Sequence, residues 1–240
     1  MKFSRILFYL SLITAAIFIL SGYGYQWEIW GLGTGFTLLR YSAYAAIALT
    51  AISGVSYWFV RKSEMRAKAY VVITFLLMGT ASLTALYWMT QARSVPPIHD
   101  ITTDIDNPPQ FSAMVRLRED APNPPEYAGE ETAEAQREAY PYIQPLMLQA
   151  GVQEVMDVAV ELIEDRGWEL VAINRKDYRI EATEKLAWFG FKDDVVLRFT
   201  ETENGTRVDM RSKSRIGRSD VGVNANRIER FLSDLENRME

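Results

Sequence analysis

Four basic residues lie close together near the C-terminus, in the stretch RSKSRIGRSD. They are Arg211, Lys213, Arg215 and Arg218, and the first acidic residue after them is Asp220. Arginine binds phosphate or carboxylate groups through two parallel hydrogen bonds, and lysine adds a point charge. A helix is predicted directly afterwards, and the free N–H groups of a helix N-terminus also attract anions. These residue types and this spacing predict a site for an anion or an acidic partner.

The predicted anion- or partner-binding site draws on two strands and the last helix, and its members are Arg198, Arg211, Lys213, Arg215, Arg218, Asn224 and Arg227. Asp220 or Ser219 is the predicted N-cap of that helix, and a carboxylate there would occupy the same N–H groups and repel an anion. The alternative is that the cations are neutralised internally, by Glu181, Asp193, Asp194, Asp209 and Asp220. Both interpretations remain open at this level.

The candidate catalytic residues are Asp193, Asp194, His99 and Asp100. Two adjacent carboxylates can share a proton and act in acid–base catalysis. Neighbouring residues of a strand point to opposite faces, however, so Asp193 and Asp194 cannot easily act together. The alternative is that one of them pairs with Arg215 or Arg218. No nucleophile motif, phosphate-binding loop or dinucleotide-binding loop accompanies them, so a protein that is not an enzyme is favoured over a hydrolase.

Neither a metal site nor a cofactor is expected. The sequence has no cysteine and one histidine, His99, which excludes disulfides, thiol catalysis and multi-histidine metal sites. The stretch HDITTDIDN, from His99 to Asn107, offers several oxygen ligands for a hard cation. It lacks the glycine and the terminal glutamate of a calcium-binding loop, and Asp and Asn are common in turns. A structural turn is therefore favoured over a metal or carboxylate site.

Three long uncharged stretches precede these residues, at about 6–27, 41–60 and 69–92. Each is long enough at about 1.5 Å per residue to cross a hydrocarbon core of about 30 Å. None carries a charge in its middle, which argues against an ion or proton pathway. The first stretch could instead be a cleaved signal peptide whose basic region contains Lys2 and Arg5. We predict three transmembrane helices in residues 1–93.

The distribution of charge predicts the orientation of these helices. Residues 1–93 carry eight basic and two acidic residues, whereas residues 94–240 carry 18 and 29. Lys2 and Arg5 precede the first span, and four of the basic residues lie between the second and third spans. Short loops rich in Lys and Arg stay in the cytoplasm, so the N-terminus is expected inside and the C-terminal part outside. The net negative charge of that part argues against nucleic acid as a partner.

The soluble part is predicted to be an α+β domain in which helices cover one face of a four-stranded antiparallel sheet. Residues 94–147 are rich in proline and are expected to form an irregular arm packed on the domain, with a short acidic helix at about 129–140. The core, residues 148–240, begins with a helix whose buried face is predicted from i, i+3, i+4 spacing as Val152, Val155, Met156, Ala159, Leu162 and Ile163. Four strands follow, and a last helix is expected at about 221–238.

The dipeptide Asn204-Gly205 predicts a two-residue hairpin turn between the last two strands. With that turn, Phe199 would face Met210 on the core side, and Arg198 would lie opposite Arg211. Like charges directly opposite each other are destabilising. The two arginines would therefore need a neighbouring carboxylate, such as Glu181 or Asp209, or a bound anion.

Three motifs in this region resemble domain-of-unknown-function family 1499. They are WFGFKDDVVLR from Trp188 to Arg198, VDMRSKSRIGRSD from Val208 to Asp220, and GVNANRI from Gly222 to Ile228. The resemblance covers about the last 90 residues, and IHDITTDIDNPPQF resembles the start of the domain in membrane-anchored bacterial members. It implies a bacterial envelope protein and no activity. Trp188, Phe191, Asp209 and Asp220 are expected to have structural roles, with Phe191 filling the core.

These observations predict a binding or assembly module of the bacterial inner membrane, with a cytoplasmic N-terminus and a periplasmic C-terminal domain. Its partner would be a protein or an anionic headgroup at the arginine-rich site. The alternatives are an envelope hydrolase that uses Asp193 or Asp194 with His99, and a structural subunit of a membrane complex.

Overall fold

The computed structural model describes all 240 residues, which divide into two compact units. The first, here called the helical unit, comprises residues 1–90 together with the four-residue loop 187–190. The second, here called the soluble unit, comprises residues 91–186 and 191–240.

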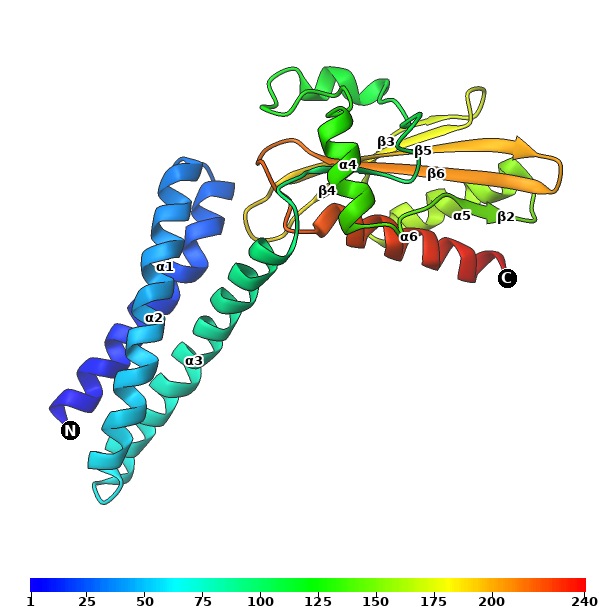
Figure 1. The fold of residues 1–240 in the computed structure, drawn as a ribbon. Helices are drawn as coiled ribbons and strands as arrows, with labels where there is room; N and C mark the ends of the chain where they lie inside the picture. Colours follow the sequence, from blue (N-terminus) through cyan, green and yellow to red (C-terminus); the bar gives the residue numbers. More distant parts are fainter. The chain divides into compact units, whose positions relative to one another are not determined.

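The helical unit contains three helices: α1 (Lys2–Gln26), α2 (Leu32–Val60) and α3 (Met65–Ser94) (Figure 1). All three are long and apolar enough to cross a membrane, with mean hydropathies of 2.1, 1.5 and 1.9 over their most apolar windows. This confirms the three predicted apolar helices. Each helix is longer than its predicted stretch, because the residues that flank the stretch continue the helix.

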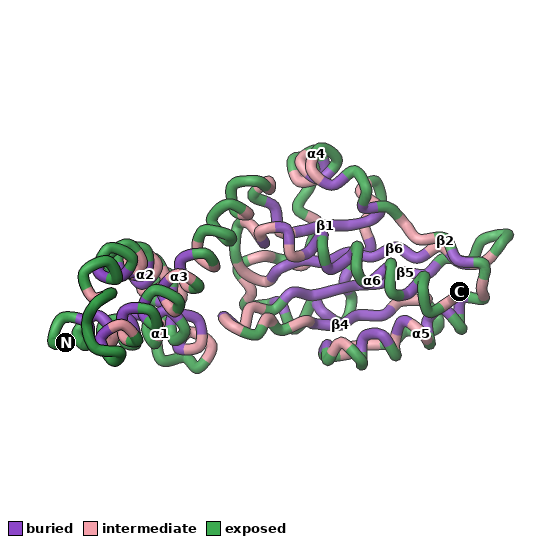
Figure 2. The backbone as a smooth tube through the Cα atoms, turned by 90° about the horizontal axis from the view of Figure 1, so that it is seen from below, coloured by how far each residue is buried: buried purple, intermediate pink, exposed green.

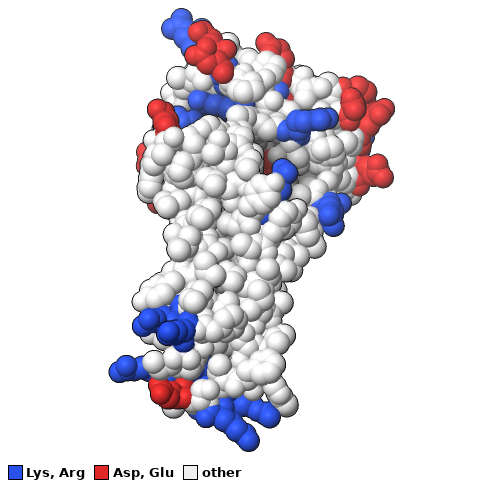
Figure 3. Space-filling model, turned by 90° about the vertical axis from the view of Figure 1, so that its left-hand side faces the viewer, with Lys and Arg blue, Asp and Glu red and all other residues white.

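Small polar side chains lie where the three helices meet. The Ser11 and Thr74 hydroxyls are 3.5 Å apart, and those of Thr50 and Ser82 are 3.3 Å apart. Ser11 also donates to the carbonyl of Phe8 at 2.7 Å, so its hydroxyl is satisfied within its own helix. Small residues allow close approach of helices in a bilayer, where no hydrophobic effect drives them together. Figure 3 shows the sides of the helices as an almost uncharged surface with Lys and Arg gathered at one end.

The loop Ala187–Gly190 belongs to the helical unit because of its contacts with α1 and α2. The indole N–H of Trp188 donates to the carbonyl of Ile19 at 2.8 Å, and its ring packs where Gly22 has no side chain. A Cβ at Gly22 would lie 2.5 Å from Trp188 Cδ1. The structural role expected for Trp188 is thus a contact with helix α1.

The soluble unit is built on an antiparallel sheet of six strands. Their order is β1-β6-β5-β4-β3, with β2 pairing the other end of β6 on the same side as β1. Four strands match the prediction: β3 (Glu169–Asn174), β4 (Arg179–Lys185), β5 (Lys192–Thr202) and β6 (Gly205–Ser214). The predicted count of four was wrong, because β1 (Asp100–Thr102) and β2 (Leu146–Leu148) also join the sheet.

Helices α5 (Val152–Asp165) and α6 (Val223–Met239) cover one face of this sheet (Figures 1 and 2). The six residues predicted for the buried face of α5 are all buried. Together with Leu197, Phe199 and Met210 from the strands and Phe231 from α6 they form the main core. Phe191, which was expected to fill the core, is only half-buried.

The region predicted to be an irregular arm contains regular structure of its own. Besides β1 and β2 it includes the 3-10 helix η1 (Ala113–Arg118). Helix α4 (Glu130–Ala139) confirms the short acidic helix predicted at about 129–140. The side chain of Gln136 in α4 bonds both backbone groups of Thr102, accepting from its N–H at 3.1 Å and donating to its carbonyl at 2.6 Å. Helix α4 therefore satisfies the outer edge of β1, which would otherwise lack partners.

The predicted pairing of β5 with β6 was wrong by two residues. Arg198 lies opposite Asp209 rather than Arg211, and Phe199 lies opposite Val208. The turn consists of Glu203 and Asn204, since Thr202 pairs with Gly205. Asn204 has no positive φ, which the predicted turn type would need, whereas Gly205 has φ +138°. A shift by two keeps each side chain on its predicted face but changes its partner.

Candidate functional site

The sheet face turned away from α5 and α6 carries most of the predicted site residues. Strand alternation places Glu181, Asp194, Arg198, Asp209, Arg211 and Lys213 on this face. Residues 103–128, here called the covering segment, run from the end of β1 and supply most of the groups that these side chains contact. The arrangement is therefore a charged layer between the sheet and the covering segment.

Asp194 lies at the centre of one part of this layer and has no exposed side-chain surface. Its Oδ2 is 2.6 Å from Arg118 Nη1 and 2.8 Å from Arg215 Nε, and its Oδ1 is 2.8 Å from Arg215 Nη2. The hydroxyl of Thr183 donates to the same Oδ1 at 2.7 Å. A buried carboxylate held by two arginines and a hydroxyl is fully satisfied and has no free lone pair directed at solvent.

Asp100 holds a second pair of cations. Arg211 bonds it in the two-pronged manner typical of arginine, with Nε–Oδ1 at 2.8 Å and Nη2–Oδ2 at 2.9 Å. Lys213 Nζ lies 3.1 Å from Oδ2. All three side chains are buried almost completely. Burial lowers the pKa of Lys213, and the charge of Asp100 opposes that change.

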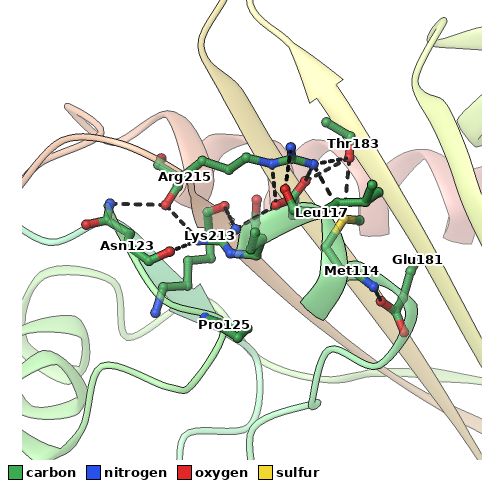
Figure 4. Close-up of polar contacts among 12 residues, drawn as sticks. Met114, Leu117, Asn123, Pro125, Glu181, Thr183, Lys213 and Arg215 are labelled. Carbon is green, nitrogen blue, oxygen red and sulfur yellow. Dashed lines mark hydrogen bonds and ion pairs between the residues drawn. The ribbon is translucent and has the colours of Figure 1, made fainter. Parts of the chain in front are cut away.

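These two groups contain four cations and two carboxylates, and carbonyl oxygens of the covering segment complete the coordination of the cations. Arg211 donates to the carbonyls of Pro109 and Pro125, at 3.2 and 3.0 Å. Lys213 donates to the carbonyl of Glu126 at 2.5 Å, and Arg215 to that of Leu117 at 3.0 Å. Figure 4 shows Lys213 and Arg215 directed towards this segment from the sheet. The basic strand thus binds its own chain.

Glu181 provides the complementary interaction for the N–H groups of the covering segment. Its carboxylate accepts from the backbone of Ser112 at 2.9 Å, Ala113 at 3.1 Å and Met114 at 2.8 Å (Figure 4). These are the free N–H groups of the first turn of η1, which a negative charge stabilises. Glu181 therefore fixes η1 on the sheet and does not neutralise Arg198.

Arg198 and Arg207 share two carboxylates at the other end of the face. Arg198 Nη2 lies 2.8 Å from Asp104 and 2.9 Å from Asp209, and Arg207 Nη2 contacts the same carboxylates at 3.0 and 2.9 Å. Asp209 is buried and Asp104 nearly so. Arg198 also faces Arg179 of β4, so a like-charge pair exists, although not with Arg211.

Asp193 points to the opposite face of the sheet, towards α6. Its Oδ2 accepts from Arg227 Nη2 at 2.6 Å, and Arg227 also contacts Glu184 and the side-chain oxygen of Asn224. Asp193 and Asp194 therefore lie on opposite faces and do not form a carboxylate pair.

Asp220 lies beside the N-terminus of α6 and accepts from the N–H groups of Gly222 at 2.9 Å and Asn224 at 2.7 Å. The N-cap residue itself is Gly222 rather than Asp220 or Ser219. Burial raises the pKa of Asp220, and the two N–H groups oppose that change. Its carboxylate occupies the donors that an anion would need at this helix end.

His99 and Arg218 are predicted site residues that form no ion pair in the charged network. His99 is half-buried, and burial lowers its pKa, with Lys213 adding to the effect and Asp100 opposing it. Arg218 is exposed, and its guanidinium forms no ion pair. The structure thus separates Arg218 from Arg198, which lies at the far end of the strands.

Four members of the network were not identified from the sequence: Arg118, Asp104, Arg207 and Glu184. Arg118 and Asp104 lie in the covering segment, where neither hydrophobic period nor spacing indicates a buried side chain. Arg118 is nevertheless 1% exposed. The one local signal was the RSKSR stretch itself, because its three cations, on or directly after a mostly buried strand, require partners.

Comparison with known proteins identifies one family. The model of the family described as "Protein of unknown function (DUF1499)" matches residues 100–235, which include the whole charged layer. No curated protein and no solved structure matches the sequence. More than half of the chain is matched, and the chain therefore belongs to the DUF1499 family of proteins of unknown function.

Proposed function

We propose that this chain is a membrane-anchored, non-enzymatic binding or assembly module of the bacterial envelope. The observation that carries the proposal is the pairing of Asp100, Asp193 and Asp194 with buried arginines. These are the carboxylates that a catalytic mechanism would have to use. Because these carboxylates are held in buried ion pairs, a rigid scaffold is favoured over a hydrolase.

A hydrolytic mechanism needs a carboxyl group within hydrogen-bond reach of a substrate or a water. Asp193 is 2% exposed and Asp194 is not exposed at all. Reaching Asp194 would require the covering segment to leave the sheet, which would separate Arg118 from Asp194 and remove the Leu117 carbonyl from Arg215. Opening of this kind is costly because it exposes a buried and uncompensated charge network.

The exposed end of the arginine-rich loop after β6 is the proposed contact for a partner. Arg211, Lys213 and Arg215 are occupied by the covering segment, whereas Arg218 projects from the loop before α6 without an ion pair. An acidic group of a protein partner would complete the coordination of its guanidinium. We therefore propose Arg218, one of the seven residues predicted from the sequence, as the partner contact, together with its neighbours in the loop 216–219.

The proposed location is the bacterial inner membrane, with the soluble unit in the periplasm. The three candidate transmembrane helices indicate membrane localisation. The concentration of Lys and Arg in the connection 61–68 supports a cytoplasmic position for that connection. An odd number of spans then brings the soluble unit to the other side.

Site-specific photo-crosslinking in intact cells tests the partner contact. A photoreactive amino acid is placed at position 216 of the full-length chain, beside Arg218, and, as the matched control, at Lys176 in the exposed turn between β3 and β4. A discrete adduct at 216, absent at 176 and lost when Arg218 is also changed to Glu, is the expected result. No adduct at 216, or equal adducts at both positions, contradicts the proposed contact.

A further inference from the structure

A groove lies on the surface of the helical unit between α2 and α3. It has a volume of about 330 Å³, and its lining residues are Ser53, Gly54, Tyr57, Val71, Val72 and Phe75. Val71 at its floor is fully buried, whereas Tyr57, Val72 and Phe75 are 48%, 39% and 45% exposed and form its rims. The groove is therefore apolar and open along the sides of the helices, where a bilayer would place hydrocarbon chains.

Gly54 lines the groove without a side chain of its own. A Cβ at this position would already lie 3.5 Å from the ring of Phe75 on the facing helix. A methyl group fits at that distance, but any larger side chain would fill the space between the two helices. The position thus offers a direct way to close the groove without changing its charge.

The connection between the same two helices is strongly basic. Arg61, Lys62, Arg66 and Lys68 lie within eight positions, with Glu64 as the one acidic residue. None of the four forms an ion pair, in contrast to the buried cations of the soluble unit. The guanidinium of Arg61 lies 3.6 Å from the ring centroid of Trp58, a cation–π contact that leaves its charge without a carboxylate partner. This connection carries uncompensated positive charge where headgroups would lie.

The groove ends within one helical turn of these cations. Arg61 follows Tyr57 by four residues, which is about 6 Å along α2, and Lys68 precedes Val71 by three residues, about 4.5 Å along α3. This spacing matches a lipid whose acyl chain lies in an apolar groove and whose phosphate lies at the membrane surface. Basic pockets between transmembrane helices are a recognised setting for anionic lipid headgroups.

We propose that this groove binds one acyl chain of an anionic phospholipid, whose phosphate contacts Arg61, Arg66 and Lys68. The space suits a single chain and is narrower than a transmembrane helix, whose diameter with side chains is about 10–12 Å. The excess positive charge distinguishes an anionic lipid from a zwitterionic lipid, which would leave it uncompensated. This site is independent of the partner contact proposed for the soluble unit.

Native mass spectrometry of the full-length protein, released from nanodiscs of equal phosphatidylglycerol and phosphatidylcholine content, tests the proposal. The wild type should retain one lipid with at least about a five-fold preference for phosphatidylglycerol, since a single basic residue near a membrane surface already contributes about this factor. The triple variant Arg61→Gln/Arg66→Gln/Lys68→Gln should lose the preference. Lys2→Gln/Arg5→Gln, which changes cations of α1 that do not line the groove, should keep it.

The apolar half of the site is tested by Gly54→Leu, with Gly33→Leu at the other end of the same helix as its control. Nothing lies within 4 Å of a Cβ at Gly33, so the same substitution there fills no groove. Gly54→Leu should lose the retained lipid of either class, and Gly33→Leu should retain it. Equal retention of both lipids by the wild type, or undiminished retention by Gly54→Leu, overturns the proposal. A wild-type dimer that Gly54→Leu abolishes would assign the groove to a second copy and would also overturn it.

Discussion

At the scale of single residues, the buried carboxylates of the soluble unit neutralise its buried cations. Asp194 compensates Arg118 and Arg215, and neither arginine has a second carboxylate within reach of an ion pair. Removing one partner of a buried ion pair leaves an uncompensated charge, which costs more than the intact pair contributes. The fold therefore depends on Asp194 more than on any exposed ion pair.

Asp194→Ala is expected to lower the free energy of unfolding by about 3–5 kcal/mol. The matched control is Asp234→Ala, which removes the carboxylate of an ion pair with Arg166 and is 55% exposed. Exposed pairs of this kind contribute about 0–1 kcal/mol. Denaturant unfolding of the full-length protein in detergent, followed through the soluble unit, measures both. Equal losses in the two variants would contradict the structural role of the buried network.

His99 gives the protein a defined response to acid. Its usual pKa of 6.5 is lowered in the folded state, first by burial and then by Lys213. Below pH 6.5 the unfolded chain therefore binds more protons at this residue than the folded chain does, so stability falls as pH falls from 6.5 through the folded pKa.

Thermal melting between pH 7.5 and 5 should show this loss of stability, and His99→Gln should lose less over the same range. Because the sequence has one histidine, the difference between the two curves reports His99 alone. A larger acid-induced loss in His99→Gln than in the wild type would show that the pKa is raised rather than lowered.

At the scale of secondary-structure elements, prediction succeeded where a periodic pattern was long. The 14 residues of α5 gave its buried face correctly, and the alternation of β5 gave the correct faces of Asp193 and Asp194. Strands β1 and β2 have three residues each and are held by pairing with β6. Three residues cannot show a period, so these strands could be known only from the partner that they find in the fold.

The same reasoning explains which part of the candidate site could be predicted. The arginines were recognisable because they are clustered in the sequence. Their partners Asp100 and Asp104 come from more than 90 residues earlier in the chain, and Arg118 from a segment without a pattern. The two-residue error in register also assigned Arg198 and Arg211 to each other, because Gly205 was taken to be part of the turn.

Gly205 begins β6, and its conformation is fixed by a tertiary contact. A Cβ at this position would lie 2.0 Å from the carbonyl oxygen of Leu148 in β2, and the residue has φ +138°. Gly205→Ala should therefore lower the free energy of unfolding by roughly 2–4 kcal/mol, because the strained backbone and the steric overlap act together.

Gly129→Ala is the control for backbone strain alone, because Gly129 has φ +89° but no atom within 4 Å of a Cβ. We expect Gly129→Ala to lower the free energy of unfolding by about 1 kcal/mol. Thermal denaturation of both full-length variants measures the difference. If Gly205→Ala were no worse than Gly129→Ala, the close approach of β2 to β6 would be in doubt.

Glu181 holds the covering segment on the sheet by accepting hydrogen bonds from η1. Replacing Glu181 by Gln keeps its shape but removes the charge and one of the acceptor oxygens that hold the three N–H groups of η1. Hydrogen–deuterium exchange should accelerate at residues 112–118 and remain unchanged in α5. An unchanged rate at 112–118 would mean that other contacts suffice to hold η1.

At the scale of the whole molecule, the two units differ in whether basic side chains are paired with carboxylates. The soluble unit pairs its buried cations internally, whereas the helical unit leaves those of the 61–68 connection unpaired. Unpaired basic residues beside a span are retained on the cytoplasmic side during insertion. The same residues that we propose to contact an anionic lipid would therefore also determine the orientation of the chain.

Alkaline phosphatase fusions test this orientation, since the enzyme is active only when it is exported. A fusion after Glu240 should be active, and a fusion after Ser63, within the basic connection, should be inactive. Changing Arg61, Lys62, Arg66 and Lys68 to Gln should lower the activity of the Glu240 fusion at equal protein level, because it removes the charge difference that retains the connection. Changing Arg198, which lies in the soluble unit, to Gln should not. An inactive Glu240 fusion together with an active Ser63 fusion would reverse the proposed topology and place the soluble unit in the cytoplasm.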